Sequence, residues 1–155
     1  MKTLVVLVCF VVALANAETK RKAYDLPDGV KLLLGKVDTS FVCSNDGYYA
    51  DVGNKCKIFH VCETVRYPNG QQEIKQSSFM CGNQTVFNQA SFTCAFPEES
   101  ILCKNAPDFF YLNNKLGQVN VPFLDEDDIR RSKPLIPSLS FKPQPQVFRS
   151  VGRRG

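Results

Sequence analysis

The stretch CSNDGYYADVGNKCKIFHVCETVRYPNGQQEIKQSSFMCGNQTVFNQASFTCAFPEESILC, residues 43–103, holds six of the seven cysteines of the chain. Their spacing is Cys43-x12-Cys56-x5-Cys62-x18-Cys81-x12-Cys94-x8-Cys103. An even number of cysteines in an exported chain predicts disulfides, although six cysteines allow fifteen pairings that spacing alone does not separate. A module of about sixty residues buries too little surface to be stable by packing alone. We therefore expect three disulfides, each contributing about 2–4 kcal/mol.

Residues 1–17 have the features of a secretory signal peptide, which also contains the seventh cysteine, Cys9. Lys2 precedes an apolar run from Leu4 to Leu14, and Ala15-Asn16-Ala17 supplies small residues for cleavage. The run is too short to cross a bilayer, which needs about 20 residues. We expect a secreted, extracellular protein that begins near Glu18 and does not bind a membrane.

Alternating and aromatic segments indicate short strands within the cysteine-rich module. The expected strands are Gly47–Asp51, Lys57–Cys62, Gln71–Cys81, Thr85–Phe87 and Phe92–Cys94. Pro68-Asn69-Gly70 is a strong turn signal between the second and third of them. The sequence therefore predicts a small disulfide-rich all-β fold, with a three-stranded antiparallel sheet and a two-stranded hairpin.

The segments on either side of the module differ from it in composition. Residues 18–40 form a lead segment without a clear period, and residues 113–155 form a tail rich in proline and charge. We expect this tail to be disordered beyond about residue 118. Phe109-Phe110-Tyr111 is too apolar for a free tail, so the folded module is expected to extend over residues 41–112.

The distribution of charge argues against a nucleic-acid partner. The chain has a net charge of +4, but residues 43–103 hold four Lys or Arg against six Asp or Glu. The excess of positive charge lies in residues 104–155, with nine basic against five acidic residues. A nucleic-acid-binding module carries its basic residues on the folded part, so we expect no nucleic-acid binding.

The cysteine spacing and the segments between the cysteines resemble the type-2 chitin-binding, or peritrophin-A, domain of arthropods. The gaps Cys56-x5-Cys62 and Cys81-x12-Cys94 are similar to that family. The similar segments are Gly47-Tyr48-Tyr49-Ala50-Asp51, Phe59-His60-Val61-Cys62 and Thr85-Val86-Phe87-Asn88-Gln89. The resemblance covers about residues 41–112, and it implies the disulfides Cys43–Cys62, Cys56–Cys103 and Cys81–Cys94.

The same resemblance implies a non-catalytic, monomeric protein that binds chitin in an extracellular matrix such as cuticle or peritrophic matrix. Similar single-module chains occur as cuticular proteins and as venom proteins of centipedes. A secreted venom protein that uses the same scaffold against a protein target is therefore the alternative.

A neutral sugar polymer is bound by exposed aromatic rings that stack on it and by a few amides or hydroxyls. The module holds eight aromatic residues, namely Tyr48, Tyr49, Phe59, Tyr67, Phe79, Phe87, Phe92 and Phe96. Alternation places Phe59 and Phe87 inward. The second hairpin resembles the sugar-binding part of the family, which predicts a hydrogen bond from Asn88 and stacking by Phe96. Phe92, Tyr49 and Tyr67 are further candidates. Many family members have Asp-Trp where this chain has Ala95-Phe96.

Other signals in the sequence predict no catalysis. His60, the only histidine, is interpreted as structural. Because we expect no free thiol and the chain has no second histidine, we expect neither a catalytic pair nor a metal or cofactor. Asn83-Gln84-Thr85 is a sequon for N-glycosylation at Asn83. Arg130-Arg131 and the terminal Gly152-Arg153-Arg154 leave a minor alternative, in which the tail is a peptide precursor that releases residues 132–151.

Overall fold

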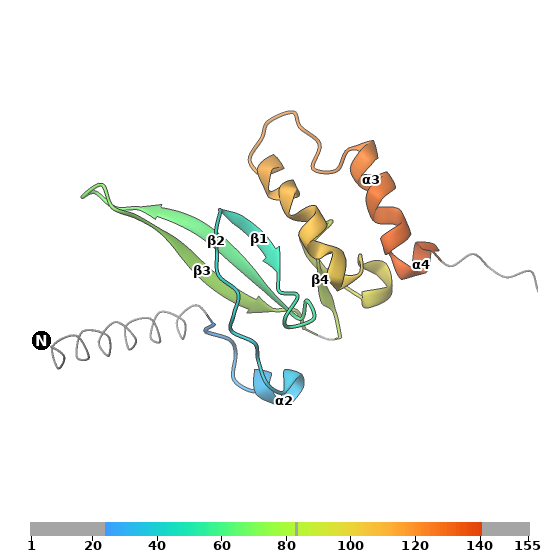
Figure 1. Cartoon of the computed structure of the whole chain (residues 1–155), viewed down its shortest axis with the longest axis horizontal. Helices are drawn as coiled ribbons and strands as arrows, with labels where there is room; N and C mark the ends of the chain where they lie inside the picture. The colour runs from blue at the N-terminus through green and yellow to red at the C-terminus, as the bar shows by residue number, and fades with distance from the viewer. Residues whose placement is uncertain (1–23, 83, 141–155) are drawn as a thin grey trace, which may run out of the picture.

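The structure is a computed structural model, and it describes residues 24–82 and 84–140 (Figure 1). The expected signal peptide, the sequon residue Asn83 and the terminal Gly152-Arg153-Arg154 lie outside the described residues. Within these two ranges, no helix has both the length and the apolar character needed to cross a bilayer.

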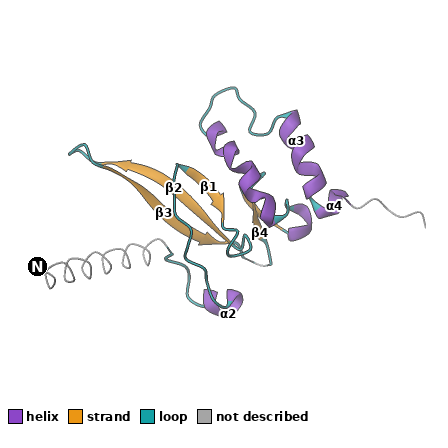
Figure 2. Cartoon of the chain, viewed as in Figure 1, coloured by secondary structure: helices purple, strands orange, loops and turns teal. Residues whose placement is uncertain are grey.

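Two antiparallel sheets form the centre of the fold (Figure 2). The first has the order β1-β2-β3, with β1 at Gly47–Ala50, β2 at Ile58–Arg66 and β3 at Gln72–Met80. The second pairs β4, Val86–Asn88, with β5, Thr93–Ala95. These sheets confirm the predicted three-stranded sheet and two-stranded hairpin. The turn at Pro68-Asn69-Gly70 joins β2 to β3, and Gly70 there has a φ of 81° that favours glycine.

The structure adds helices to the predicted all-β fold (Figure 2). They are α2 at Val30–Leu34, the 3-10 helices η1 at Pro97–Glu99, η2 at Cys103–Lys115 and η3 at Lys133–Leu135, α3 at Glu126–Ser132, and α4 at Pro137–Ser140. The apolar Phe109-Phe110-Tyr111 segment lies in η2, which packs along β1. The expectation that this segment packs on the module is therefore confirmed.

Part of the tail differs from the disorder expected beyond residue 118, because helical turns lie at residues 126–135 and 137–140. Residues 141–155, to which the expectation also applies, lie outside the described residues. The acidic cluster begins α3 rather than marking a solvated chain. The Asp125 side chain accepts the Asp128 N–H at 2.9 Å, and the Asp128 side chain accepts the Asp125 N–H at 3.0 Å, which forms a capping box. Lys115 binds the same two carboxylates at 2.9 and 2.5 Å. These contacts fix α3 against η2. The amino-acid composition of the tail does not predict them, because they join particular residues of two different elements.

Three disulfides cross-link the domain, and they are the pairs that the family resemblance implied. Cys43 is bonded to Cys62, Cys56 to Cys103, and Cys81 to Cys94. The first ties the segment before β1 to β2, the second ties η2 to the loop before β2, and the third ties the end of β3 to β5.

Two apolar clusters make up the core. The first contains the buried residues Ala50, Cys56, Cys81, Val86, Phe87 and Ala106, with Phe59 packed against them. The second contains Ala90, Ile101, Phe109 and Leu112, and it is closed by side chains that include Phe123, Leu135 and Ile136 from the C-terminal segment. The predicted inward orientation of Phe87 is confirmed, whereas Phe59 is only partly buried.

Candidate functional site

The three-stranded sheet has two faces with different environments. Side chains alternate along a strand, so the register divides them into two sets. We call the first set the open face; it includes Tyr48, Phe59, Val61, Glu63, Glu73, Lys75, Ser77 and Phe79. We call the second set the covered face; it includes Tyr49, His60, Cys62, Gln76 and Ser78. The segment before β1 lies on it, through Phe41 and Cys43.

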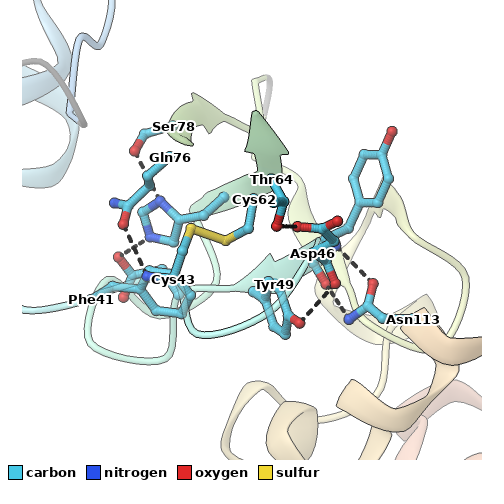
Figure 3. Close-up of a disulfide and its surroundings, with 12 residues drawn as sticks. Phe41, Cys43, Asp46, Tyr49, Cys62, Thr64, Gln76, Ser78 and Asn113 are labelled. Atoms are coloured by element: carbon cyan, nitrogen blue, oxygen red, sulfur yellow. Dashed lines mark hydrogen bonds and ion pairs between the residues drawn. A yellow bond between two sulfur atoms is a disulfide. The ribbon is translucent and has the colours of Figure 1, made fainter. Parts of the chain in front are cut away.

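A buried histidine, His60, lies on the covered face. Two of its neighbours, Phe41 and Ser78, are labelled in Figure 3 around the Cys43–Cys62 disulfide. The imidazole of His60 is fully buried, with Nε2 2.9 Å from Asp51 Oδ2 and Nδ1 2.8 Å from Ser78 Oγ. Phe41 stacks on the imidazole ring at 4.1 Å, and the Tyr24 ring meets it edge-on at 5.1 Å. Because these rings seal the imidazole from solvent, a substrate cannot reach it. The arrangement supports the structural interpretation of His60.

Asp51 is the charged member of this buried network. Burial alone would raise the pKa of its carboxyl group, but hydrogen bonds from His60 and Asn54 outweigh that effect and hold the pKa below its ordinary value. Burial and the nearby Asp51 charge also raise the pKa of the Tyr24 phenol, which therefore stays protonated. The network anchors the segment before β1, since Tyr24 and Phe41 both come from it.

A row of aromatic rings, which we call the aromatic stack, begins on the open face with Phe79 and Phe59 and continues into the second hairpin with Phe87 and Phe92. Phe59 lies between Phe79, at 5.4 Å between ring centroids, and Phe87, at 4.4 Å. Phe92 continues the row and meets Tyr48 at 5.6 Å. The Phe79 ring at one end is 47% exposed, so the row begins with an accessible ring and runs into the buried core at Phe87.

Phe96 is a second exposed ring, and it lies just beyond β5. It is 45% exposed and precedes η1, which begins at Pro97. The main chain is fixed there, because the Phe96 carbonyl accepts the Glu99 N–H at 2.9 Å and the Ser100 hydroxyl at 3.0 Å. The ring is therefore presented to solvent from an anchored backbone.

Residues 43–103 match the family described as the chitin binding Peritrophin-A domain. The chain carries a chitin-binding peritrophin-A domain. The resemblance proposed from the sequence is thus confirmed, and the match ends at the last cysteine, before most of η2 and all of α3.

Two curated relatives are centipede U-scoloptoxins. The chain is 30% identical to U-scoloptoxin(01)-Er1a from Ethmostigmus rubripes over 96 residues, which is 61% of this chain and 66% of that protein. It is 32% identical to U-scoloptoxin(01)-Cw1a from Cormocephalus westwoodi over 84 residues, or 53% of this chain and 64% of that protein. The chain thus spans just under two thirds of the length of these relatives. No solved structure matches the chain.

Asn88 has a backbone role in the peritrophin-A domain. Its side chain is buried, and Oδ1 accepts the N–H of Ala90 at 3.1 Å and of Ile101 at 3.4 Å. These bonds form the turn between β4 and β5 and join it to the segment before η2. The amide oxygen of Asn88 is therefore engaged by the main chain, and the expected hydrogen bond between Asn88 and sugar stays a prediction.

The other predicted site residues are distributed over different surfaces of the domain. Phe92 is at the second hairpin, half-buried, with the Phe123 ring edge-on against it at 4.9 Å. Tyr49 is on the covered face and meets Phe110 at 5.0 Å. Tyr67 lies at the β2–β3 turn, at the far end of the sheet from β4 (Figure 1). The structure brings Phe92 and Phe96 to one hairpin and separates Tyr49 and Tyr67 from them.

Sequence reasoning did not place Phe79 and Tyr48 on the face of the sheet that carries the exposed end of the aromatic stack. Both were counted among the aromatic residues, but neither was assigned to a face. The signal that identifies them is the register, which places Phe79 opposite Phe59 and Tyr48 opposite Val61. In residues 24–82 and 84–140, no group of three His, Cys, Asp or Glu side chains is placed to hold a metal ion.

Proposed function

We propose that the protein is a secreted, non-catalytic chitin-binding protein of an extracellular matrix, and that Phe96 on the second hairpin stacks on the sugar. The observation that carries this proposal is an exposed ring on an anchored backbone, inside a domain whose family binds chitin. Three disulfides support secretion, because such bonds persist in oxidising compartments.

The local structure of Phe96 favours binding because little freedom is lost when a ligand arrives. The Cys81–Cys94 disulfide lies two residues before Phe96, and Pro97 restricts the backbone after it. A ring already held in place adds to affinity mainly by reducing the entropy lost on binding. Phenylalanine provides a smaller face than the tryptophan common in the family, so we expect weaker binding than that of family members with Asp-Trp.

Retention on insoluble chitin tests this function. The oxidised, full-length secreted protein should be retained by chitin and not by cellulose, and Phe96→Ala should reduce retention. Phe96→Trp should increase it. Tyr67→Ala is a matched control, because Tyr67 is 43% exposed at the far end of the sheet, and it should bind as the wild type does. Equal retention of Phe96→Ala and wild type would remove Phe96 from the site.

The similarity to U-scoloptoxins supports a second candidate, a secreted venom protein acting on a protein target. The absence of tryptophan from the chain also favours it, since the strongest sugar-stacking residue is missing. A correctly disulfide-bonded protein that chitin does not retain would place this candidate first. Expression in a venom gland, compared with epidermis or gut, is an independent test.

The peptide-precursor alternative loses support from the position of Arg131. This residue is in α3, with its guanidinium 5.6 Å from the centre of the Phe109 ring and 5.1 Å from that of Tyr111. A protease that cuts after paired arginines needs an extended chain, so α3 would have to unwind first. Glycosylation at Asn83 stays a prediction, which a mass shift after enzymatic deglycosylation would test.

A further inference from the structure

We infer that Phe79, at the exposed end of the aromatic stack, is a second sugar-stacking position, and that one β-linked sugar chain contacts Phe96 and Phe79 together. This inference rests on the proposed chitin-binding function and adds to it a second ring on another sheet. Four observations carry it: the exposure of the ring, its support, its relation to Phe96, and the charge of the surrounding surface.

The Phe79 ring is exposed and also held in place. Although 47% exposed, it stacks on Phe59 with an interplanar angle of 24°, and Phe59 in turn stacks on the buried Phe87. Exposed large apolar side chains are common on proteins when they occur singly. Phe79 differs because it terminates a supported row and lies on the edge strand β3. A sugar ring placed on its free face would extend the row by one ring.

The Cys81–Cys94 disulfide relates Phe79 to Phe96. Phe79 is two residues before Cys81 at the end of β3, and Phe96 is two residues after Cys94, just past β5. The Cα atoms of the two cysteines are 5.7 Å apart. With two extended residues on each side, the two aromatic Cα atoms are at most roughly 19 Å apart. A sugar polymer of a few units spans such a distance, so one chain is long enough to contact both rings.

The charges on the open face favour a neutral ligand. Lys75 is opposite Glu63 across the β2–β3 pair, and Glu73 lies farther along the same face. This balance gives no positive surface for a phosphate-rich or acidic partner. Ser77 is the next residue of β3 on that face, so its hydroxyl is placed beside the Phe79 ring, and the Lys75 and Glu63 pair follows one position farther along the sheet. Such groups hydrogen-bond to the hydroxyl and acetamido groups at the rim of a sugar.

Oligosaccharide length separates the two rings experimentally. The full-length, oxidised protein is titrated calorimetrically with the disaccharide and the hexasaccharide of chitin. Phe96→Ala should weaken the binding of both sugars. Phe79→Ala should weaken the affinity for the hexasaccharide by about threefold to tenfold and leave the affinity for the disaccharide unchanged. Phe79→Tyr, which keeps a ring, should bind the hexasaccharide as the wild type does.

Ile74→Ala is the matched control for removing apolar surface. Ile74 is also on β3 and 40% exposed, but it belongs to the covered face. This variant should bind both sugars normally. If Phe79→Ala lowers the melting temperature too far for titration, the ring resonances of Phe79 in the wild-type protein are followed by NMR. They should shift with the hexasaccharide.

The outcomes distinguish the inference from the function on which it rests. A wild-type protein that binds neither sugar would overturn the chitin-binding function itself. Normal hexasaccharide binding by Phe79→Ala, with weakened binding by Phe96→Ala, would overturn the second position alone. Hexasaccharide-induced shifts that spare the Phe79 ring would do the same.

Discussion

The side chain of Asn113 hydrogen-bonds to both backbone groups of Tyr48 at the free edge of β1. Its Oδ1 accepts the Tyr48 N–H at 2.7 Å, and its Nδ2 donates to the Tyr48 carbonyl at 3.1 Å. Gln89 adds a second amide, which donates to the same carbonyl at 2.8 Å and accepts the Ala50 N–H at 2.7 Å. Two side chains thus take the place of a neighbouring strand. An edge covered in this way is protected from pairing with another chain.

The contact between Asn113 and β1 predicts a strict requirement for glycine at position 47. Gly47 has a φ of 138°, and a Cβ placed there would lie 2.3 Å from Asn113 Oδ1. Gly47→Ala should therefore destabilise the protein by about 2–3 kcal/mol through backbone strain and steric overlap. Denaturant unfolding measures this loss. In a Gly47→Ala, Asn113→Ala double variant, part of it should be recovered, and strict additivity of the two single losses would contradict the proposed overlap.

The buried Asp51 carboxylate predicts a dependence of stability on pH. Its folded pKa is below the ordinary 3.8, so its contribution is complete above about pH 4 and is lost as the pH falls through the folded value. Asp51→Asn should cost about 2–3 kcal/mol at neutral pH, because hydrogen bonds to a charged group are lost. It should also flatten the decline in stability on acidification. Urea unfolding of both proteins at several pH values checks this, and parallel declines would exclude Asp51 as the titrating group.

Asp128 should control the attachment of α3. The Lys115 and Tyr111 hydrogen bonds outweigh the burial that would raise its pKa, and they lower that pKa to about 2. Its stabilising contribution is therefore present above about pH 4 and is lost on acidification toward pH 2. Asp128→Asn should speed tryptic cleavage after Arg130 and Arg131 by about fivefold to tenfold, because the capping box and ion pair are lost.

The exposed pair Arg130–Asp127 supplies the control for that experiment. These side chains form an ion pair at 2.6 Å and are 76% and 71% exposed. Asp127→Asn should leave the cleavage rate almost unchanged, because a surface ion pair adds little to stability. Equal acceleration by both substitutions would mean that general loss of negative charge, rather than the attachment of α3, sets the rate.

The disulfides should differ in their contribution to stability. Cys56 and Cys103 are separated by 47 residues, against 13 for Cys81 and Cys94. The longer loop loses more entropy in the unfolded state, so replacing the Cys56–Cys103 pair by alanines should cost about 1 kcal/mol more. Thermal unfolding of the two double variants tests this order. The reverse order would indicate that local packing around the second hairpin dominates.

Local patterns in the sequence predicted the strands well because each strand has its own signal. Alternation identified β2, and Pro68-Asn69-Gly70 identified the turn after it. The contact of Asn88 with the main chain of Ile101 could not be predicted, for the opposite reason. This hydrogen bond to the Ile101 N–H joins residues 13 positions apart, and no local pattern contains that information.

The C-terminal helices were missed for a related reason. Composition described the stretch around Asp125 as acidic and proline-rich, but Lys115 and Tyr111, which bind its carboxylates, precede it in another element. The sequence did contain a signal for the start of α3. Asp125 and Asp128 have the spacing of a capping box, in which each side chain accepts the backbone N–H of the other residue. Phe79 shows the same limit, since only the pairing of β3 with β2 places its ring on Phe59.

Phe123, Leu135 and Ile136 pack on the second core cluster, so the part of the chain that folds together is longer than the part that matches the family. The family match ends at Cys103, yet these side chains cover Phe109 and its neighbours, and the Leu135 carbonyl accepts the Leu102 N–H at 3.0 Å. A recombinant fragment cut at the family boundary would expose that apolar surface to water and to other copies of itself. A fusion partner joined after residue 140 would leave the core closed.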